Sequence, residues 1–366
     1  MYRLREDRNL KYYFVIFLLL VGNVTALSEE DFSEEEEESF DVIEVVMEHI
    51  SDAHQWHILD YTNRHGNKVH LSMPLPVILW HEGRLWFYSS DHFYHSTHPV
   101  PIGNDFVVLH QEHFYLTDAE GSLHFNKDGH ITNISPSDFS ITQNVASMFL
   151  SVVLILWMFL SAARAYARFG MTPPKGFRAV LEPIILFVRD DIARAQIDKD
   201  KADKFVPFLL TIFFFVWINN LIGIVPFFPG GSNLSGNISF TATLAVFAFL
   251  AINLFGSESY WKHTFTAPGI PFPVKFILVP LEIIGIFTKP FALMIRLFAN
   301  ITAGHIIILS LISIIFILKS IYIAPMSVVL SLVMYLLELL VAVLQAYIFT
   351  LLTALFIGMS TSESEH

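Results

Sequence analysis

Two long apolar runs near the C-terminus constrain this chain more than any other feature. They extend from Phe276 to Leu318 and from Pro325 to Gly358. As helices they would be roughly 65 Å and 50 Å long, whereas about 20 helical residues cross a hydrocarbon core of ~30 Å. Helices that exceed the core by so much are expected to tilt. The sequence therefore predicts a steeply tilted antiparallel hairpin that turns at Lys319 to Ile323.

The first run carries charge at membrane depth. A charged side chain there costs several kcal/mol, and such residues usually mark an ion pathway. On a helix, with 100° between residues, four polar side chains fall within about 40° of one another: Glu282, Lys289, Arg296 and Asn300. This stripe favours a helix that faces a polar partner rather than lipid. A salt-bridged seam inside a helical bundle is the alternative interpretation.

The hairpin brings specific residues together. One register places His305 level with Glu338, and the same register places Arg296 level with Gln345. However, the nine residues between Arg296 and His305 turn these two side chains about 180° apart. A straight hairpin would not serve both pairs, so we expect a bend near Gly304. Residues spaced by seven on the second run share one face: Ser331, Glu338 and Gln345.

Composition excludes several classes of protein. The 366 residues are 54% hydrophobic and 15% charged, which is typical of an integral membrane protein. The absence of cysteine excludes disulfides and thiolate metal sites. The net charge of −12 comes mostly from eleven acidic residues between Glu29 and Glu48, and nothing basic enough for nucleic acid remains. No phosphate-binding Gly-rich loop with Lys-Ser/Thr occurs, so we expect no nucleotide site and no cofactor.

The chain divides into four predicted segments. Residues 1–26 have the basic end, apolar middle and small-residue cleavage site of a secretory signal peptide; an uncleaved anchor is the alternative. Residues 27–51 form an acidic, disordered linker, and residues 52–138 an exported segment. There, aromatic and polar residues alternate between turn signals, which predicts short antiparallel strands. Residues 139–366 form the membrane domain.

Thirteen of the sixteen histidines lie between His49 and His130, in or next to the exported segment. Metal binding is one interpretation. The spacings are irregular, however, and apart from near neighbours such as His92, His95 and His98 no ligand set is evident. We therefore expect surface histidines and no metal site. A buffering or docking lid at a channel mouth is the alternative role for this segment.

The membrane domain is predicted to be all-α with five crossings. Besides the two long helices, the spans are Val145 to Ala163, Phe205 to Phe228 and Phe240 to Phe255. Nine Lys and Arg between Arg164 and Lys204 mark the cytoplasmic side, so the mature N-terminus lies outside and the C-terminus inside.

Within that basic loop, the sequence from Phe177 to Ile197 predicts a helix along the membrane surface. Its apolar face is expected to carry four residues: Val180, Ile184, Phe187 and Val188.

The motif Met294-Ile-Arg-Leu-Phe-Ala-Asn-Ile-Thr-Ala-Gly-His305 resembles the arginine helix of subunit a of the F-type ATP synthases. That helix reads Arg-Leu-Phe-Gly/Ala-Asn, followed by Ala-Gly and then His or Glu. The segment Asn219-Asn-Leu-Ile-Gly-Ile-Val-Pro226 resembles a second element of the family, with Asn220 at the matching asparagine. The resemblance covers Phe139 to the C-terminus.

The resemblance implies a non-catalytic stator subunit of the proton channel in a bacterial inner membrane. Its partners would be a ring of c subunits, the subunit b stalk, the remaining synthase subunits and membrane lipids. Arg296 would hold a ring carboxylate deprotonated, with Gln345 and Asn300 orienting its guanidinium. Seven residues would line the two half-channels: Arg296, His305, Glu338, Gln345, Asn300, Glu282 and Asn220.

Within that scheme Glu338 and His305 would relay protons from outside. Glu282 fits the inner exit, with Lys289 as an ion-pair partner. A secondary cation/proton antiporter is the alternative function; it would need internal repeats, which the sequence does not show.

Overall fold

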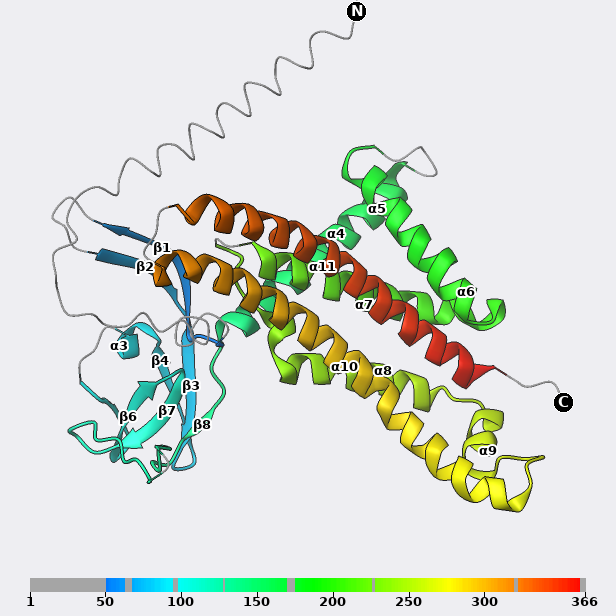
Figure 1. Ribbon diagram of the computed structural model, residues 1–366, viewed down its shortest axis with the longest axis horizontal. Helices are drawn as coiled ribbons and strands as arrows, with labels where there is room; N and C mark the ends of the chain where they lie inside the picture. Colours follow the sequence, from blue (N-terminus) through cyan, green and yellow to red (C-terminus); the bar gives the residue numbers. More distant parts are fainter. Residues whose placement is uncertain are drawn as a thin grey trace, which may run out of the picture. The chain divides into compact units, whose positions relative to one another are not determined.

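The computed structural model describes residues 51–62, 68–94, 98–127, 129–169, 175–225, 228–318 and 322–362. The predicted signal peptide and all but the last residue of the predicted linker lie outside these ranges. The described chain begins with a β-rich region and continues as a set of helices (Figure 1).

The described residues of the β-rich region form eight short strands and one short helix. These are β1 (Gln55–Thr62), β2 (Lys68–Pro74), β3 (Pro76–His81), β4 (Arg84–Ser89), α3 (Asp91–Tyr94), β5 (Val100–Ile102), β6 (Asp105–His110), β7 (His113–Thr117) and β8 (Ser137–Asp138). They form three small sheets with the orders β1-β2, β4-β3-β8 and β5-β6-β7. Every described pairing is antiparallel, so the predicted short antiparallel strands are confirmed.

Alternation along the strands builds a small core. In β3, Val77 and Leu79 point inward and are almost fully buried, while their neighbours are more exposed. Side chains two apart on a strand share one face, which is why the period-two pattern could be read from the sequence. The core contains Val77, Leu79, Val100, Ile102, Val107 and Phe114.

The rest of the chain is helical. The elements are α4 (Gln143–Phe169), α5 (Phe177–Leu186), η1 (Phe187–Ala193), α6 (Arg194–Gln196), α7 (Lys199–Ile224), η2 (Leu234–Gly236), α8 (Ile238–Leu254), α9 (Glu258–Thr266), α10 (Phe272–Ile317) and α11 (Ala324–Thr361). Among the described residues four helices are long and apolar enough to cross a membrane: α4, α7, α10 and α11. A fifth crossing is counted if α8 and α9, which meet at 98°, form one broken span. The predicted count of five stays a prediction.

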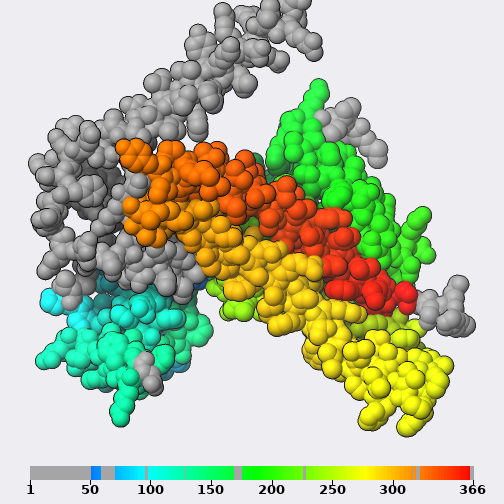
Figure 2. Space-filling model, in the orientation of Figure 1, coloured from blue at the N-terminus to red at the C-terminus, as the bar shows by residue number. Residues whose placement is uncertain are grey.

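The two long helices lie side by side and antiparallel (Figure 1). With 46 and 38 residues they are roughly 69 Å and 57 Å long, slightly longer than predicted. Helix α10 continues through Pro290 and Gly304. In the space-filling view α10 and α11 form a continuous surface (Figure 2), and many of their large apolar side chains are exposed, as expected for helices that meet lipid or a membrane partner.

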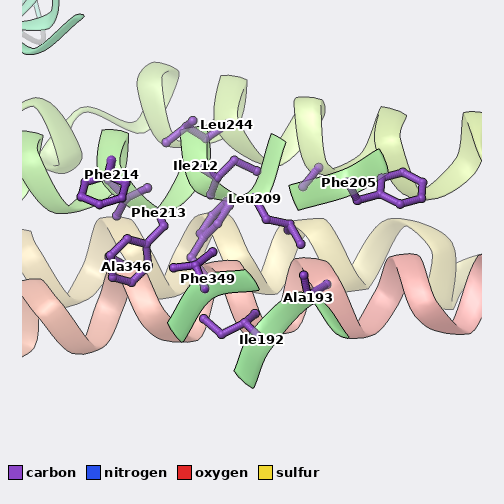
Figure 3. Close-up of a cluster of buried hydrophobic side chains, with 14 of the residues drawn as sticks. Ile192, Ala193, Phe205, Leu209, Ile212, Phe213, Phe214, Leu244, Ala346 and Phe349 are labelled. Carbon is purple, nitrogen blue, oxygen red and sulfur yellow. The ribbon is translucent and has the colours of Figure 1, made fainter. Parts of the chain in front are cut away.

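Helix α7 supplies the centre of the membrane core (Figure 3). Leu209, Phe213 and Phe214 are almost fully buried, and α7 contacts α4, α11 and η1. The facing side of α11 carries small buried residues, including Ala342 and Ala346. Small side chains let membrane helices approach closely, so the aromatic bulk of α7 fits against the small face of α11.

The segment from Phe177 to Gln196 is helical, and its placement along the membrane surface stays a prediction. Val180, expected on the apolar face, is 62% exposed, whereas Ile192 is fully buried. From Phe187 to Ala193 the segment forms a π-helix, whose wider turn changes the angular spacing of residues from Phe187 onward; Val180 precedes it. The buried face of η1 packs against α7 and α11.

One glycine of α11 marks where this segment and the hairpin touch. A Cβ on Gly358 would lie 1.9 Å from the backbone oxygen of Gln196, and a backbone atom does not move aside cheaply. We expect Gly358→Ala to lower the free energy of unfolding of the purified protein by roughly 1–3 kcal/mol, and its melting temperature with it. Gly285→Ala in α10 is the control, because no atom lies within 4 Å of its Cβ position. Equal melting temperatures for the two variants would contradict this contact.

Candidate functional site

A buried carboxylate faces a histidine across the α10–α11 hairpin. Nε2 of His305 lies 3.6 Å from Oε1 of Glu338, and the two side chains are 19% and 3% exposed. Both carboxylate oxygens of Glu338 lack a hydrogen-bond partner within the described ranges. A buried ionised carboxylate needs a countercharge, and imidazole can supply one because it titrates near neutral pH. The pair is therefore suited to accept and release a proton.

Gly304 makes the approach of the two helices possible. A Cβ on Gly304 would lie 3.0 Å from Oε1 of Glu338 and 3.3 Å from its carboxyl carbon. The carboxylate therefore rests against the backbone of α10, one residue before His305. We had expected Gly304 to bend the helix; its place beside Glu338 gives it a packing role.

Asn300 and Gln345 form the second contact across the hairpin. Nδ2 of Asn300 donates a hydrogen bond of 3.1 Å to Oε1 of Gln345, which is 2% exposed. The sequence register had paired Gln345 with Arg296 instead. Within the described part of the chain, Arg296 has no hydrogen bond or ion pair to either amide.

Arg296 lies on the outer face of α10. Leu293 and Leu297 on either side of it in sequence are buried at 1% and 0% exposure, and they turn the arginine outward to an exposed position. Since nine residues separate Arg296 from His305, the two side chains leave the helix on nearly opposite sides. His305 therefore faces the interior of the helical domain, and Arg296 lies on its surface.

Asn220 comes to the site from α7. It is 2% exposed; it accepts a hydrogen bond of 2.5 Å from Oγ of Ser235 and donates one of 3.4 Å to the carbonyl oxygen of Ala342. Nearby, a Cβ on Gly223 would lie 3.9 Å from Nε2 of His305. Helix α7 thus reaches the His305–Glu338 pair through Gly223 and buries Asn220 one turn earlier.

Sequence reasoning missed Ser235, and no motif could have found it. Its partner is 15 residues away in the sequence, and the two meet only because η2 packs between α7 and α10.

The predicted ion pair between Glu282 and Lys289 is wrong. No salt bridge joins them; instead Nζ of Lys289 lies over the ring of Phe356, 5.4 Å from its centroid. Residues seven apart on a helix are about 10 Å apart along the axis, which is long for direct contact. Glu282 is half-buried and, 14 residues before Arg296, lies roughly 20 Å away along α10.

The β-rich region offers one group spaced for a metal ion among the residues described. His81, Glu82 and Asp105 have ligand atoms within 4.8 Å of one another, and Nε2 of His81 lies 3.0 Å from Oδ2 of Asp105. These residues come from two different hairpins, so sequence spacing could not reveal them. His95, one of the histidines singled out in the sequence, lies outside the described residues. The expectation of no metal site stays a prediction.

The chain is similar to known proteins over most of this helical part. The family described as "ATP synthase A chain" matches residues 145–358, which is more than half of the chain. The chain belongs to the ATP synthase A chain family. It is therefore a non-catalytic, proton-translocating component of the membrane sector of ATP synthase.

Similar proteins include ATP synthase subunit a of Chloroherpeton thalassium, which is 45% identical over 63% of this chain and 69% of its own length. ATP synthase subunit a of Chlorobium phaeobacteroides strain DSM 266 is 45% identical over 63% and 67%, respectively. ATP synthase subunit a 2 of Chlorobium luteolum is 39% identical over 72% and 80%.

A second family, described as a domain of unknown function (DUF8433), matches residues 45–139 of this ATP synthase A chain. It covers the whole β-rich region. The recognised family thus accounts for the helices, and a separate family of unstated function accounts for the strands.

The contact at Gly304 generates a prediction for this A chain. Gly304→Ala would place a methyl group against the Glu338 carboxylate and displace it from His305. We expect ATP-driven acidification of inverted membrane vesicles to fall about tenfold, since displacements near 1 Å can cost that much or more. Gly285→Ala in the same helix, with open space around its Cβ, is expected to pump normally. If both variants pump alike, Gly304 is not needed for this contact.

Proposed function

We propose that residues 139–366 are the stator half of a proton channel that couples proton flow to rotation of a ring of c subunits. The observation that carries this is the arrangement of α10: a buried His305–Glu338 pair faces inward, and Arg296 is exposed on the opposite side. The buried face of α10 offers a proton path, and its exposed face offers a fixed charge to a passing partner. In this scheme the subunit b stalk and the remaining synthase subunits hold the chain still.

The outer half-channel runs through Asn220, His305 and Glu338. The carboxylate and the imidazole are 3.6 Å apart, so a small movement brings them within hydrogen-bond reach and lets one pass a proton to the other. Asn220, buried and hydrogen-bonded to Ser235, lines the approach from outside.

Arg296 acts by charge on the ring. Its guanidinium is always protonated, and at 4 Å from a carboxylate near a protein surface it contributes about 4 kcal/mol. That is about three pKa units, enough to keep a passing ring carboxylate ionised at neutral pH. The same charge repels protons, so they do not leak between the half-channels without rotation. The Asn300–Gln345 pair, one turn along α10, stiffens the helix contact beneath it.

The inner half-channel contains Glu282. It lies on the same stripe of α10 as Arg296, nearer the helix N-terminus, and is half-buried. Lys289, which contacts Phe356 instead of Glu282, has a packing role between α10 and α11.

Residues 1–26 direct export in this proposal, and residues 52–138 lie outside the cell inner membrane. The basic segment between α4 and α7 lies in the cytoplasm, in agreement with the positive-inside rule.

The charge of Arg296 is the first thing to test. We expect Arg296→Ala to abolish ATP-driven proton pumping and ATP synthesis while the complex still assembles, because the side chain is exposed and its loss leaves no cavity. Arg296→Lys should restore little, since a desolvated ammonium can lose its proton. Vesicle acidification and subunit content are measured together. Near-normal coupled synthesis in Arg296→Ala would remove the proposed role.

The orientation of the chain in the membrane is tested by the accessibility of tags placed near its two ends. A peptide tag after Ala26 should be accessible to an antibody from outside the inner membrane, and a tag after His366 only from the cytoplasm. Two tags on the same side would contradict five crossings.

A further inference from the structure

The start of the β-rich region is tied to the start of the first membrane helix. Oδ1 of Asp52 accepts a hydrogen bond of 3.1 Å from the backbone N–H of Asn144, and Oδ2 accepts one of 2.9 Å from Thr142. The N–H of Gln143 donates to the carbonyl oxygen of Ala53 at 2.8 Å. The Asp52 carboxylate and the Ala53 carbonyl therefore each satisfy one free N–H group at the N-terminus of α4, where a carboxylate is favoured.

Trp56 extends this connection to a loop between two other membrane helices. The indole is 4% exposed, and its Nε1–H donates a hydrogen bond of 3.2 Å to the carbonyl oxygen of Gly230. Its ring also meets the ring of Phe228 edge-on, at 5.2 Å between centroids. Gly230 and Phe228 belong to the connection between α7 and α8, and we call residues 228–237 the outer loop. A buried Trp with its N–H satisfied is a strong anchor.

The outer loop in turn contacts the proton path. Oγ of Ser235 donates to Oδ1 of Asn220. The carbonyl oxygen of Ser232 lies 3.1 Å from the point where a Cβ on Gly223 would be, and that same point is 3.9 Å from Nε2 of His305. The loop therefore touches both the buried asparagine and the backbone beside the histidine.

A buried ion cluster holds the other end of the connection. His54, 3% exposed, lies between two carboxylates: Nδ1 is 3.1 Å from Glu112 and Nε2 is 3.0 Å from Asp138. Burial alone would lower the pKa of His54, but the hydrogen bonds and charges of Asp138 and Glu112 outweigh it and raise the pKa to about 9. Through this cluster His54 ties the chain before β1 to the β6–β7 turn and to β8.

We propose that residues 52–138 are a clamp on the outer loop, and that Trp56 is the positioning residue through which this clamp holds the loop against Asn220 and His305. This rests on the function proposed above. Surface loops are ordinarily the most mobile parts of a fold, and this one contains Gly230 and Gly231. Anchored at Trp56, the loop keeps the outer proton path in one arrangement, and proton uptake from outside depends on that anchor.

The position of the loop can be measured directly. The natural chain has no cysteine, so Ser232→Cys, at a site 1% exposed, adds a single thiol to this subunit. The assembled synthase, reconstituted with its exported side outward, is treated with a membrane-impermeant maleimide. We expect Trp56→Ala to accelerate labelling of this thiol at least about tenfold, because local opening now exposes it. The matched control is Trp80→Ala, at an exposed tryptophan on β3.

Proton uptake is measured with the same variants in the natural Ser232 background. ATP synthesis is recorded against the pH of the exported side. For Trp56→Ala we expect the proton concentration at half-maximal rate to rise about threefold to tenfold, with the maximal rate within a factor of about two. A general loss of folding would lower the maximal rate instead. Trp56→Phe keeps the ring contact with Phe228 but removes the N–H donor to Gly230, and an intermediate shift is expected; it carries the test if Trp56→Ala does not assemble.

The outcomes separate the clamp from the channel. The clamp is overturned if the Trp56 variants match Trp80→Ala both in the rate of thiol labelling and in the proton dependence of ATP synthesis. It is also overturned if the labelling rate rises without any shift in that proton dependence. If Trp80→Ala gives the same effects as Trp56→Ala, the specific role of Trp56 is overturned. Glu338→Gln tests the channel separately: normal synthesis there would contradict the proposed function, whatever Trp56 does.

Discussion

The burial of one carboxylate, Glu338, between two long helices is the constraint on which the membrane domain depends. An ion in such a place costs several kcal/mol unless a countercharge and close packing compensate. Gly304 lets the carboxylate approach the backbone of α10, and His305 stands 3.6 Å away as the basic partner. On the side of α7, Asn220 is buried and hydrogen-bonded to Ser235 of the outer loop. Each of these features would be unfavourable in an apolar bundle without the others.

The unbroken course of α10 gives its two faces different tasks. His305, which contacts Glu338, and Arg296, which is exposed, point in directions about 180° apart around the helix axis. In the function proposed above, the proton path therefore lies inside the subunit and the fixed charge of Arg296 faces a partner outside it. The hairpin is held in place elsewhere by the aromatic core of α7 (Figure 3). The close contact of Gly358 with Gln196 holds it as well.

The sequence was sufficient for features set by local periodicity. The long hairpin, the short antiparallel strands and the burial of Ser331, Glu338 and Gln345 on one face all follow from fixed repeats along a helix or a strand. It failed where geometry departs from those repeats. The 100° repeat did not predict the π-helix at Phe187–Ala193. A bend was expected at Gly304 because Arg296 and His305 lie on opposite sides of the helix, and the packing of Gly304 against Glu338 was not foreseen.

Contacts between distant segments were also invisible in the sequence. Ser235 meets Asn220, and Trp56 meets Gly230, because of how η2 and the β-rich region pack. No spacing rule connects residues 174 positions apart. Asn300 pairs with Gln345 because its side chain reaches across the hairpin. The register predicts which residues lie at the same height along the two helices, but not which side chains point toward each other.

The most direct test of the account is an exchange of the buried pair. If His305 and Glu338 act as one proton-accepting unit, the unit should tolerate swapping its two members between the helices. His305→Glu alone leaves two carboxylates together, and Glu338→His alone leaves two imidazoles, so each should impair ATP-driven acidification of inverted vesicles. The account predicts that the double exchange recovers more proton flux than either single change, a favourable coupling in a double-mutant cycle. A double variant whose defect is the sum of the two single defects would contradict it.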